Sequence, residues 1–233
     1  MKKIIFDNKI NLFFLLISLF FVTSVVGLEN IYFSSVKWLH SLETSTHQIG
    51  WYFFKNDVWR FPFGSNPNYG QTLGNCIVFS DSIPLLALFF KLIKPIISQD
   101  FQYFSFWYFL CFYLQLYFSF KILEKFTNSE IHSFIGALFF LIAPIFIYRV
   151  TFHAALSGQW ILLLTLFLGL NYNVEEKKLS WISLIILSSL INFYFTAMIV
   201  ATYSLLRLIN LKFERNNFYE LIKDTLIFAP CLL

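Results

Sequence analysis

The sequence predicts an all-α fold, a polytopic bundle of transmembrane helices with a large aromatic-rich outer loop that carries interfacial helices. Of the 233 residues, 58% are hydrophobic and 13% are charged, whereas an average soluble domain has about 25% charged residues. The stretches 101–120, 156–173 and 180–206 contain no charged residue at all. Apolar stretches of roughly 20 residues are long enough to cross the hydrocarbon core of a bilayer as helices.

Residues 10–27 form the first predicted span. This apolar stretch is longer than the roughly 7–15 apolar residues of a signal peptide, so we expect it to stay uncleaved. Lys2, Lys3 and Lys9 precede it. Because positive charges favour the cytoplasmic side, the N-terminus is predicted to lie in the cytoplasm.

The rest of the chain is predicted to continue as one membrane domain over residues 1–233. The further predicted spans are 101–123, 131–148, 156–172 and 179–208. The last stretch has basic residues at both ends, so it is either two short spans that turn near residues 191–195 or one long helix. Residues 224–233 begin an incomplete span, so we expect the chain to be the N-terminal part of a longer protein.

Residues 77–97 decide between two topologies. The stretch is apolar but contains Asp81, Pro84, Lys91, Lys94 and Pro95. If it spans the bilayer, the loop at 121–130 faces outward. If it instead lies in the outer interface as an amphipathic or re-entrant helix, that loop faces the cytoplasm, and Arg149 and His153 face outward. We favour the interfacial arrangement because the Lys and Arg bias is a strong orientation signal.

The outer loop, residues 28–100, is the longest region between predicted spans. Its turns are specified by glycine and proline in "FPFGSNPNYG" at residues 61–70. A disordered loop would be poor in aromatic residues, so we expect this one to be folded against the membrane. Its polar candidates are Glu43, His47, Asp57 and Arg60. The simpler alternative is an aromatic belt at the bilayer surface with no further function.

Asp81 has two compatible interpretations. It resembles a helix N-cap, with Pro84 in the first turn, and a carboxylate at a membrane edge is also a candidate functional residue. Arg149 and His153 lie four residues apart and would share a helical face. An arginine fork suits a lipid phosphate. In the favoured topology one outer face receives Glu43, His47, Asp57, Asp81, Arg149 and His153.

Other classes of site find no support in the sequence. No basic run suits a nucleic acid. Cys76, Cys111 and Cys231 are far apart, and neither a disulfide framework nor a metal-binding spacing is visible.

Four segments, covering roughly residues 35–200, carry a family resemblance: "HQIGWYFFKNDVWRFPFGSNPNYG", "IVFSDSIPLLALFFKLI", "FQYFSFWYFLCFYLQ" and "APIFIYRVTFHAAL". They resemble a family of uncharacterised bacterial multi-pass membrane proteins of the cell envelope, which is similar in layout to GT-C glycosyltransferases. The resemblance implies an enzyme of the bacterial inner membrane. It would transfer a sugar from a polyprenyl-phosphate donor, a membrane lipid, to an extracytoplasmic acceptor.

The resemblance also implies roles for residues. Glu43 or Asp57 would act as the base, and Asp81 would position the acceptor or hold a divalent cation. Arg149 with Arg60 would stabilise the departing phosphate, and His153 would assist there. His47, Trp51 and Tyr69 would contact the substrate. Where the family tends to have Gly-Asp before the His-x-x-Gly-Trp stretch, this chain has Leu42-Glu43, and glutamate keeps the charge but adds a methylene.

Two other functions are compatible with the sequence. A transporter or flippase for a lipid-linked precursor predicts ionisable residues at mid-bilayer and broken helices. A non-catalytic membrane scaffold predicts an exposed aromatic patch, with the acids dispersed.

Overall fold

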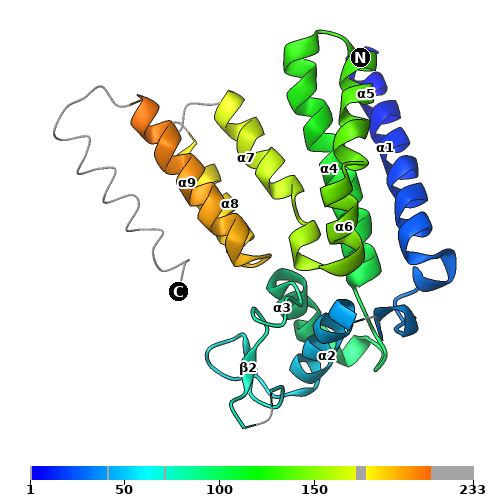
Figure 1. Ribbon diagram of the computed structural model, residues 1–233, viewed down its shortest axis with the longest axis vertical. Coiled ribbons are helices and arrows are strands. Elements are labelled where there is room, and N and C mark those ends of the chain that lie inside the picture. Colours follow the sequence, from blue (N-terminus) through cyan, green and yellow to red (C-terminus); the bar gives the residue numbers. More distant parts are fainter. Residues whose placement is uncertain (1, 41, 71, 172–176, 211–233) are drawn as a thin grey trace. The chain divides into compact units, whose positions relative to one another are not determined.

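The computed structural model describes residues 2–40, 42–70, 72–171 and 177–210. The all-α prediction is confirmed, because helices dominate the described residues and the strands there form one short antiparallel pair. The chain divides into two compact units, residues 1–158 and 159–233, which Figure 1 shows and which we describe separately.

Long helices form one part of the first unit. They are α1 (Lys2–Val26), α4 (Phe104–Thr127), α5 (Glu130–Leu141) and α6 (Pro144–Phe152). Helices α1, α4 and α5 run side by side in Figure 1. Phe14 of α1 joins all three, because its ring centroid lies 5.3 Å from that of Phe120 and 6.3 Å from that of Phe134. Such edge-to-face and stacked aromatic pairs add specific geometry to apolar burial.

Local sequence explains the turns between these helices. Asn128 ends α4 in the left-handed conformation, with φ at 49°, which asparagine tolerates better than most residues. Ser129 then caps α5 by accepting a hydrogen bond from the backbone N–H of His132. Pro144 begins α6, and α5 and α6 meet at a bend of 47°, as expected where proline interrupts helical hydrogen bonding. We call the end of the unit near Asn128 the turn end.

Residues 28–103, which we call the loop module, lie at the other end of the helices (Figure 1). Its elements are η1 (Leu28–Asn30), η2 (Lys37–His40), α2 (Leu42–Asn56), β1 (Ser65–Asn66), β2 (Asn75–Cys76), α3 (Pro84–Leu92) and η3 (Lys94–Ile96). Trp51 is completely buried, and its indole N–H donates to the carbonyl of Phe101 at 2.9 Å. Its ring also meets that of Tyr103 edge-on at 5.1 Å. These contacts tie α2 to the beginning of α4.

The length of helix α3 tests the topology in which residues 77–97 span the bilayer. It has nine residues and at 1.5 Å per residue is about 13 Å long, whereas the hydrocarbon core is about 30 Å thick. A single spanning helix over 77–97 therefore does not fit this structure. Pro84 begins α3 as the sequence indicates, but the N-cap is Ile83. The N-cap interpretation of Asp81 is thus wrong, because the turn at residues 81–83 places Asp81 two residues too early.

The second unit contains α7 (Trp160–Asn171), α8 (Lys178–Ser189) and α9 (Phe193–Asn210). The predicted stretch 179–208 therefore forms two helices that separate at residues 190–192. Ser188 of α8 donates to the hydroxyl of Thr196 at 3.1 Å, and Trp181 lies 5.5 Å from Tyr203 between ring centroids. The predicted incomplete span at 224–233 lies outside the described residues.

Length and composition identify few helices as candidate membrane spans. Within the described ranges, α4 is the one helix long and apolar enough by itself, and α5 with α6 passes the same test as a bent pair. Shorter apolar helices cover 10–26, 155–171, 178–189 and 193–209. The number of crossings stays a prediction.

Asn128→Val should destabilise the first unit by about 1–2 kcal/mol, because a β-branched residue resists the left-handed conformation. Asn128→Gly should be neutral or stabilising, because glycine adopts that conformation freely. Unfolding of the purified protein in detergent would measure both variants. Equal stability of the valine and glycine variants would contradict the strained turn.

Candidate functional site

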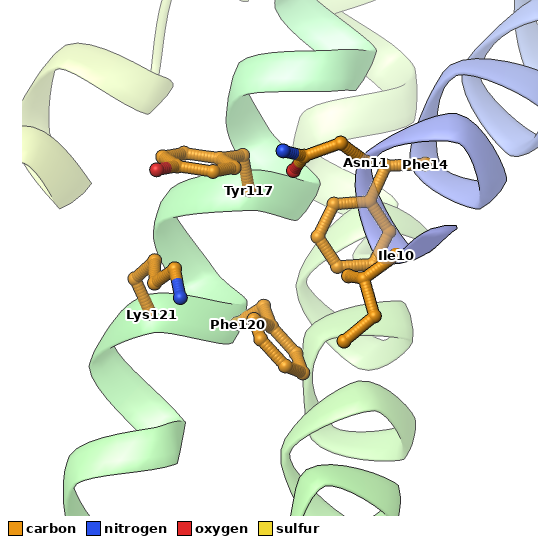
Figure 2. A pocket seen from close by; sticks show the side chains of 6 residues that line it. All are labelled: Ile10, Asn11, Phe14, Tyr117, Phe120 and Lys121. Carbon is orange, nitrogen blue, oxygen red and sulfur yellow. The ribbon is translucent and has the colours of Figure 1, made fainter. Parts of the chain in front are cut away.

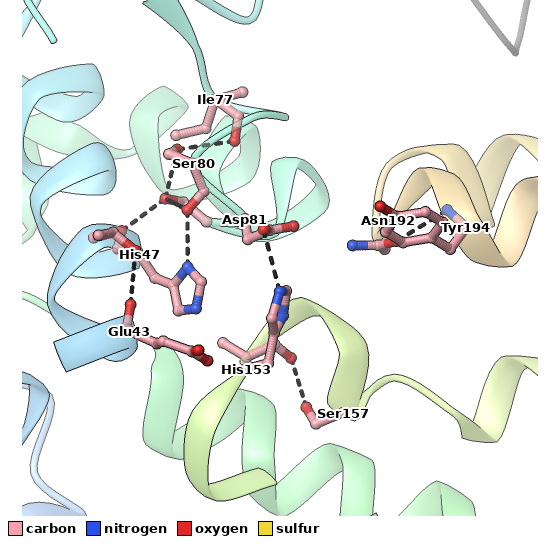
Figure 3. A network of polar contacts seen from close by, with 12 residues as sticks. Glu43, His47, Ile77, Ser80, Asp81, His153, Ser157, Asn192 and Tyr194 are labelled. Carbon is pink, nitrogen blue, oxygen red and sulfur yellow. Dashed lines mark hydrogen bonds and ion pairs between the residues drawn. The ribbon is translucent and has the colours of Figure 1, made fainter. Parts of the chain in front are cut away.

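Four ionisable side chains gather where the loop module meets the end of α6. We call Glu43, His47, Asp81 and His153 the acid–histidine cluster (Figure 3). Glu43 and His47 are four residues apart on α2 and therefore share one face of the helix. Asp81 lies in the turn before α3, and His153 ends α6. The cluster thus joins three segments that are distant in sequence.

Hydrogen bonds fix the orientation of His47. Its Nδ1 lies 2.9 Å from the carbonyl oxygen of Ser80. Because a carbonyl can only accept, Nδ1 carries the proton and Nε2 carries the lone pair. Nε2 is buried and has no hydrogen-bond partner among the described residues. The imidazole therefore presents a buried basic nitrogen within the cluster.

Gly50 allows α2 to approach the turn that contains Asp81. A Cβ at this position would lie 2.5 Å from Cβ of Ser80 and 2.8 Å from Oγ of Ser82. The hydroxyl of Ser82 donates to the carbonyl of His47 at 2.7 Å, and the hydroxyls of Ser80 and Ser82 are 2.9 Å apart. Side chain and backbone of His47 are therefore both bonded to this turn.

The turn itself has an unusual backbone. Asp81 and Ile83 both have φ at 50°, a conformation that is costly for a β-branched residue such as Ile83. Tyr103 donates its phenolic hydrogen to the carbonyl of Ser82 between them. Strained residues of this kind cost of order 1–3 kcal/mol each and are concentrated at functional sites. Here the turn directs the carboxylate of Asp81 toward α6.

Asp81 and His153 are in contact. Oδ2 of Asp81 lies 3.4 Å from Nε2 of His153, and Figure 3 shows the two side chains facing each other. A carboxylate oxygen can accept a hydrogen bond from an imidazole N–H at this position. The ring of His153 lies 5.3 Å from that of His47 between centroids. Two imidazoles and a carboxylate are thus in one small volume, and Glu43 extends toward the two rings.

Burial keeps both histidines neutral. The pKa of His47 is lowered by desolvation, and the Ser80 carbonyl and the charge of Asp81 oppose this effect only in part. The pKa of His153 is lowered by burial and further by the positive charge of Arg149, while Glu43 raises it. Neutral imidazoles at pH 7 can accept protons, which general base catalysis requires.

Asp57 and Arg60 belong to a second group, away from the acid–histidine cluster. Oδ1 of Asp57 pairs with Nη2 of Arg60 at 3.5 Å. The ammonium of the buried Lys91 lies 3.8 Å from the ring centroid of Phe54 and 4.7 Å from that of Trp59. Desolvation lowers the pKa of Lys91 to about 8, although the charge of Asp57 opposes the shift. Six residues were expected to share one face, and the structure gathers four of them in the acid–histidine cluster. Arg149 lies close enough for its charge to lower the pKa of His153.

The remaining predicted site residues pack within the loop module. Trp51 is fully buried, so its indole has no exposed face for a sugar. Tyr69 is half-buried, with its ring 5.7 Å from that of Phe53. Ser80 and Ser82 were not among the predicted site residues, although two serines that flank an acid in an apolar stretch indicate a polar site.

The cluster does not fit the divalent cation suggested at Asp81. Across residues 2–40, 42–70, 72–171 and 177–210, no three His, Cys, Asp or Glu side chains are arranged to hold a metal ion. Carboxylate-rich ligand sets are what hard divalent cations require.

The fold and the cluster define an all-α protein with an acid–histidine site at one end of a helical unit. The chain belongs to the family described as Domain of unknown function (DUF6311), whose sequence model matches residues 15–232. Neither a curated protein nor a solved structure matches the chain. The match spans the whole cluster, but the likeness to GT-C enzymes stays a proposal.

Gly50→Ala should destabilise the protein by about 1–3 kcal/mol, because the added methyl overlaps Ser80 and forces α2 away. This loss should exceed the gain of about 1 kcal/mol from replacing a helical glycine. Gly136→Ala is the matched control, because its methyl would meet only the flexible end of Leu123. Detergent unfolding curves should separate the two variants, and equal curves would refute the close approach.

The stability should fall as the pH drops below about 6.5. Both histidines have a folded-state pKa below the ordinary value of 6.5, so the unfolded chain binds more protons in that range. His47→Asn keeps a donor for the Ser80 carbonyl but does not titrate. Its unfolding free energy should therefore decline less between pH 7.5 and pH 5.5 than that of the unmodified protein, and an unchanged decline would contradict the burial of a neutral His47.

Proposed function

We propose that the protein is a multi-pass membrane glycosyltransferase of GT-C type, which transfers a sugar from a polyprenyl-phosphate donor to an extracytoplasmic hydroxyl. The observation that carries the proposal is the acid–histidine cluster. It combines a buried imidazole nitrogen, an Asp–His pair and a solvent-accessible glutamate. All four side chains lie at the end of the helices, where the loop module meets them.

Exposed apolar faces support the membrane placement. On α1, Leu12, Leu16 and Phe20 are each more than half exposed and recur every four residues, which places them on one helical face. On α5, Ile131 and Phe139 are also more than half exposed. Such faces are unfavourable in water and suit the hydrocarbon of a bilayer. Helix α4, with 24 residues, is about 36 Å long and would cross completely.

The proposed reaction needs a base on one side of the sugar and a positive charge on the other. Glu43 accepts the proton of the acceptor hydroxyl, the hydroxyl oxygen bonds to the anomeric carbon, and the bond from that carbon to the phosphate oxygen breaks. The electron pair leaves with the lipid phosphate. Arg149, one helical turn from His153, is placed to stabilise that charge through its guanidinium fork.

The arrangement favours Glu43 over Asp57 as the base. Asp57 is occupied by Arg60 and lies near the buried Lys91, whereas Glu43 is exposed and its charge acts on both histidines. Asp81 is a positioning residue for His153, because its carboxylate lies 3.4 Å from Nε2 of that imidazole. His47 supplies a second proton acceptor inside the cluster.

Partner binding is the second candidate function, and one observation favours it. Phe61, Phe63, Leu73 and Phe79 of the loop module are largely exposed, with values from 64% to 95%. The rings of Phe61 and Phe63 lie 6.1 Å apart between centroids, and exposed apolar side chains that lie together mark an interaction surface. The acids, however, converge on histidines, whereas a scaffold predicts dispersed acids. The transporter alternative has less support, because the cluster lies at the helix ends and not at mid-bilayer.

Glu43→Gln should reduce sugar transfer by about 100-fold or more, since a positioned base contributes roughly 10²–10⁴-fold. Glu124→Gln, at the turn end, is the matched control and should retain full activity. The assay uses membranes containing the full chain and a panel of polyprenyl-phosphate sugars. Full activity of Glu43→Gln would remove the base assignment.

Cysteine labelling from outside would test the topology on which this proposal rests. In a cysteine-free background, the exposed positions Ser98 and Thr151 should react with an impermeant reagent, and Asn128 should be protected. Labelling at Asn128 alone would place the cluster in the cytoplasm and contradict an extracytoplasmic reaction. Correct topology without transfer of any sugar in the panel would favour partner binding.

A further inference from the structure

A cavity of about 170 Å³ lies between α1 and α4 near the turn end of the first unit. Its walls are Ile10, Asn11, Phe14, Tyr117, Phe120 and Lys121 (Figure 2). We propose that this cavity binds the headgroup phosphate of an anionic phospholipid. The inference rests on the membrane placement proposed above, but not on the sugar-transfer chemistry.

The lining of the cavity combines two chemistries. Asn11, Tyr117 and Lys121 supply an amide, a phenol and an ammonium, while Ile10, Phe14 and Phe120 supply an apolar wall. In Figure 2, Asn11 extends from α1 toward Tyr117, and Lys121 lies one turn further along α4 on the same side. Donors beside an apolar wall match the boundary of a phospholipid, where the phosphate adjoins glycerol and acyl chains. Its volume is several times the roughly 10–15 Å³ that one water molecule needs by this measure, so a phosphate group fits.

The cavity has the right depth for a headgroup. Lys121 lies 17 residues after the beginning of α4 and Asn11 lies 15 residues before the end of α1. At 1.5 Å per residue these separations are about 25 Å and 22 Å. A hydrocarbon core of about 30 Å that begins at the loop module therefore ends close to the cavity. The ammonium of Lys121 lies 3.0 Å from Oε2 of Glu124, one turn closer to the turn end of α4.

Charge at the turn end favours an anionic lipid. Lys121 pairs with Glu124 at 3.0 Å, but such i, i+3 pairs at a surface contribute only about 0.3–0.5 kcal/mol. A lysine near anionic lipid contributes about 1 kcal/mol, and its ammonium has three donors. The exposed Lys125 is on the same helix.

A second cavity shows why the first one should be selective. It lies between α1 and α5 and is lined by Phe13, Leu16, Ile17, Phe20, Phe21, Phe134, Leu138 and Ile142. All of these side chains are apolar, so it can contact acyl chains of any lipid without regard to the headgroup. Headgroup selectivity therefore depends on the cavity that contains Lys121.

The experiment titrates phosphatidylglycerol, phosphatidylcholine and inorganic phosphate separately into the purified full chain in a neutral detergent, with thermal unfolding as the readout. Phosphatidylglycerol should raise the unfolding temperature at lower concentrations than phosphatidylcholine. Lys121→Gln should weaken the apparent affinity for phosphatidylglycerol about fivefold, which corresponds to about 1 kcal/mol. Lys121→Arg should retain the affinity, and Lys125→Gln, outside the cavity, should change it less than twofold.

Three results would overturn the proposal: equal effects of the two lipids on the unmodified protein, equal effects of Lys121→Gln and Lys125→Gln, or a shift with inorganic phosphate as large as that with phosphatidylglycerol. The last would indicate an anion site without lipid specificity. Selective lipid binding without sugar transfer would contradict only the proposed enzyme, and transfer without lipid selectivity would contradict only this site.

Discussion

The packing of α2 against Ser80 and the turn at residues 81–83 is the contact on which the cluster depends. Gly50 permits it, and two hydrogen bonds, from His47 Nδ1 to the Ser80 carbonyl and from the Ser82 hydroxyl to the His47 carbonyl, hold it. The same turn directs Asp81 toward His153. If α2 moved away by the width of a methyl group, both imidazoles would lose their fixed orientation together, because each is held through this turn.

The cluster is unfavourable in itself, so the surrounding packing has to stabilise it. Two residues of the turn are in the left-handed region, and buried imidazole nitrogens of His47 and His153 have no hydrogen-bond partner among the described residues. Each unsatisfied buried polar group costs about 1–3 kcal/mol. Completely buried Trp51 and Tyr103 lie directly behind the turn, and burial of a large aromatic side chain contributes about 1.5–3 kcal/mol. Strained backbone conformations that persist despite their free-energy cost are typical of functional sites.

Part of this site could be predicted because it depends on local spacing. Glu43 and His47 are four residues apart within α2, so helical geometry alone places this pair on one face. Arg149 and His153 have the same spacing, but His153 follows the last residue of α6 in an extended conformation. The position of Asp57 could not be predicted, because its neighbour Lys91 is 34 residues further on and meets it only through tertiary packing. The burial of Trp51 could not be predicted either, because an aromatic residue in an interfacial loop can lie on the surface or in the core. The helical class could be predicted because long apolar stretches determine it. The residue that caps α3 could not, because the cap is formed by a turn in which Ile83 adopts the left-handed conformation.

Helix α4 relates the two ends of the first unit. Its beginning is held at the cluster by Tyr103, which bonds to the Ser82 carbonyl, and its other end carries Lys121 and the cavity with Asn11. The separation along the helix, about 25 Å, is close to the thickness of the hydrocarbon core. A rigid helix of this length would hold the acid–histidine cluster at one membrane surface whenever the lysine cavity engages headgroups at the other. In the membrane placement that we propose, a headgroup bound at the turn end would therefore also influence the depth of the cluster, since mismatch between helix and bilayer costs a fraction of a kcal/mol per Å.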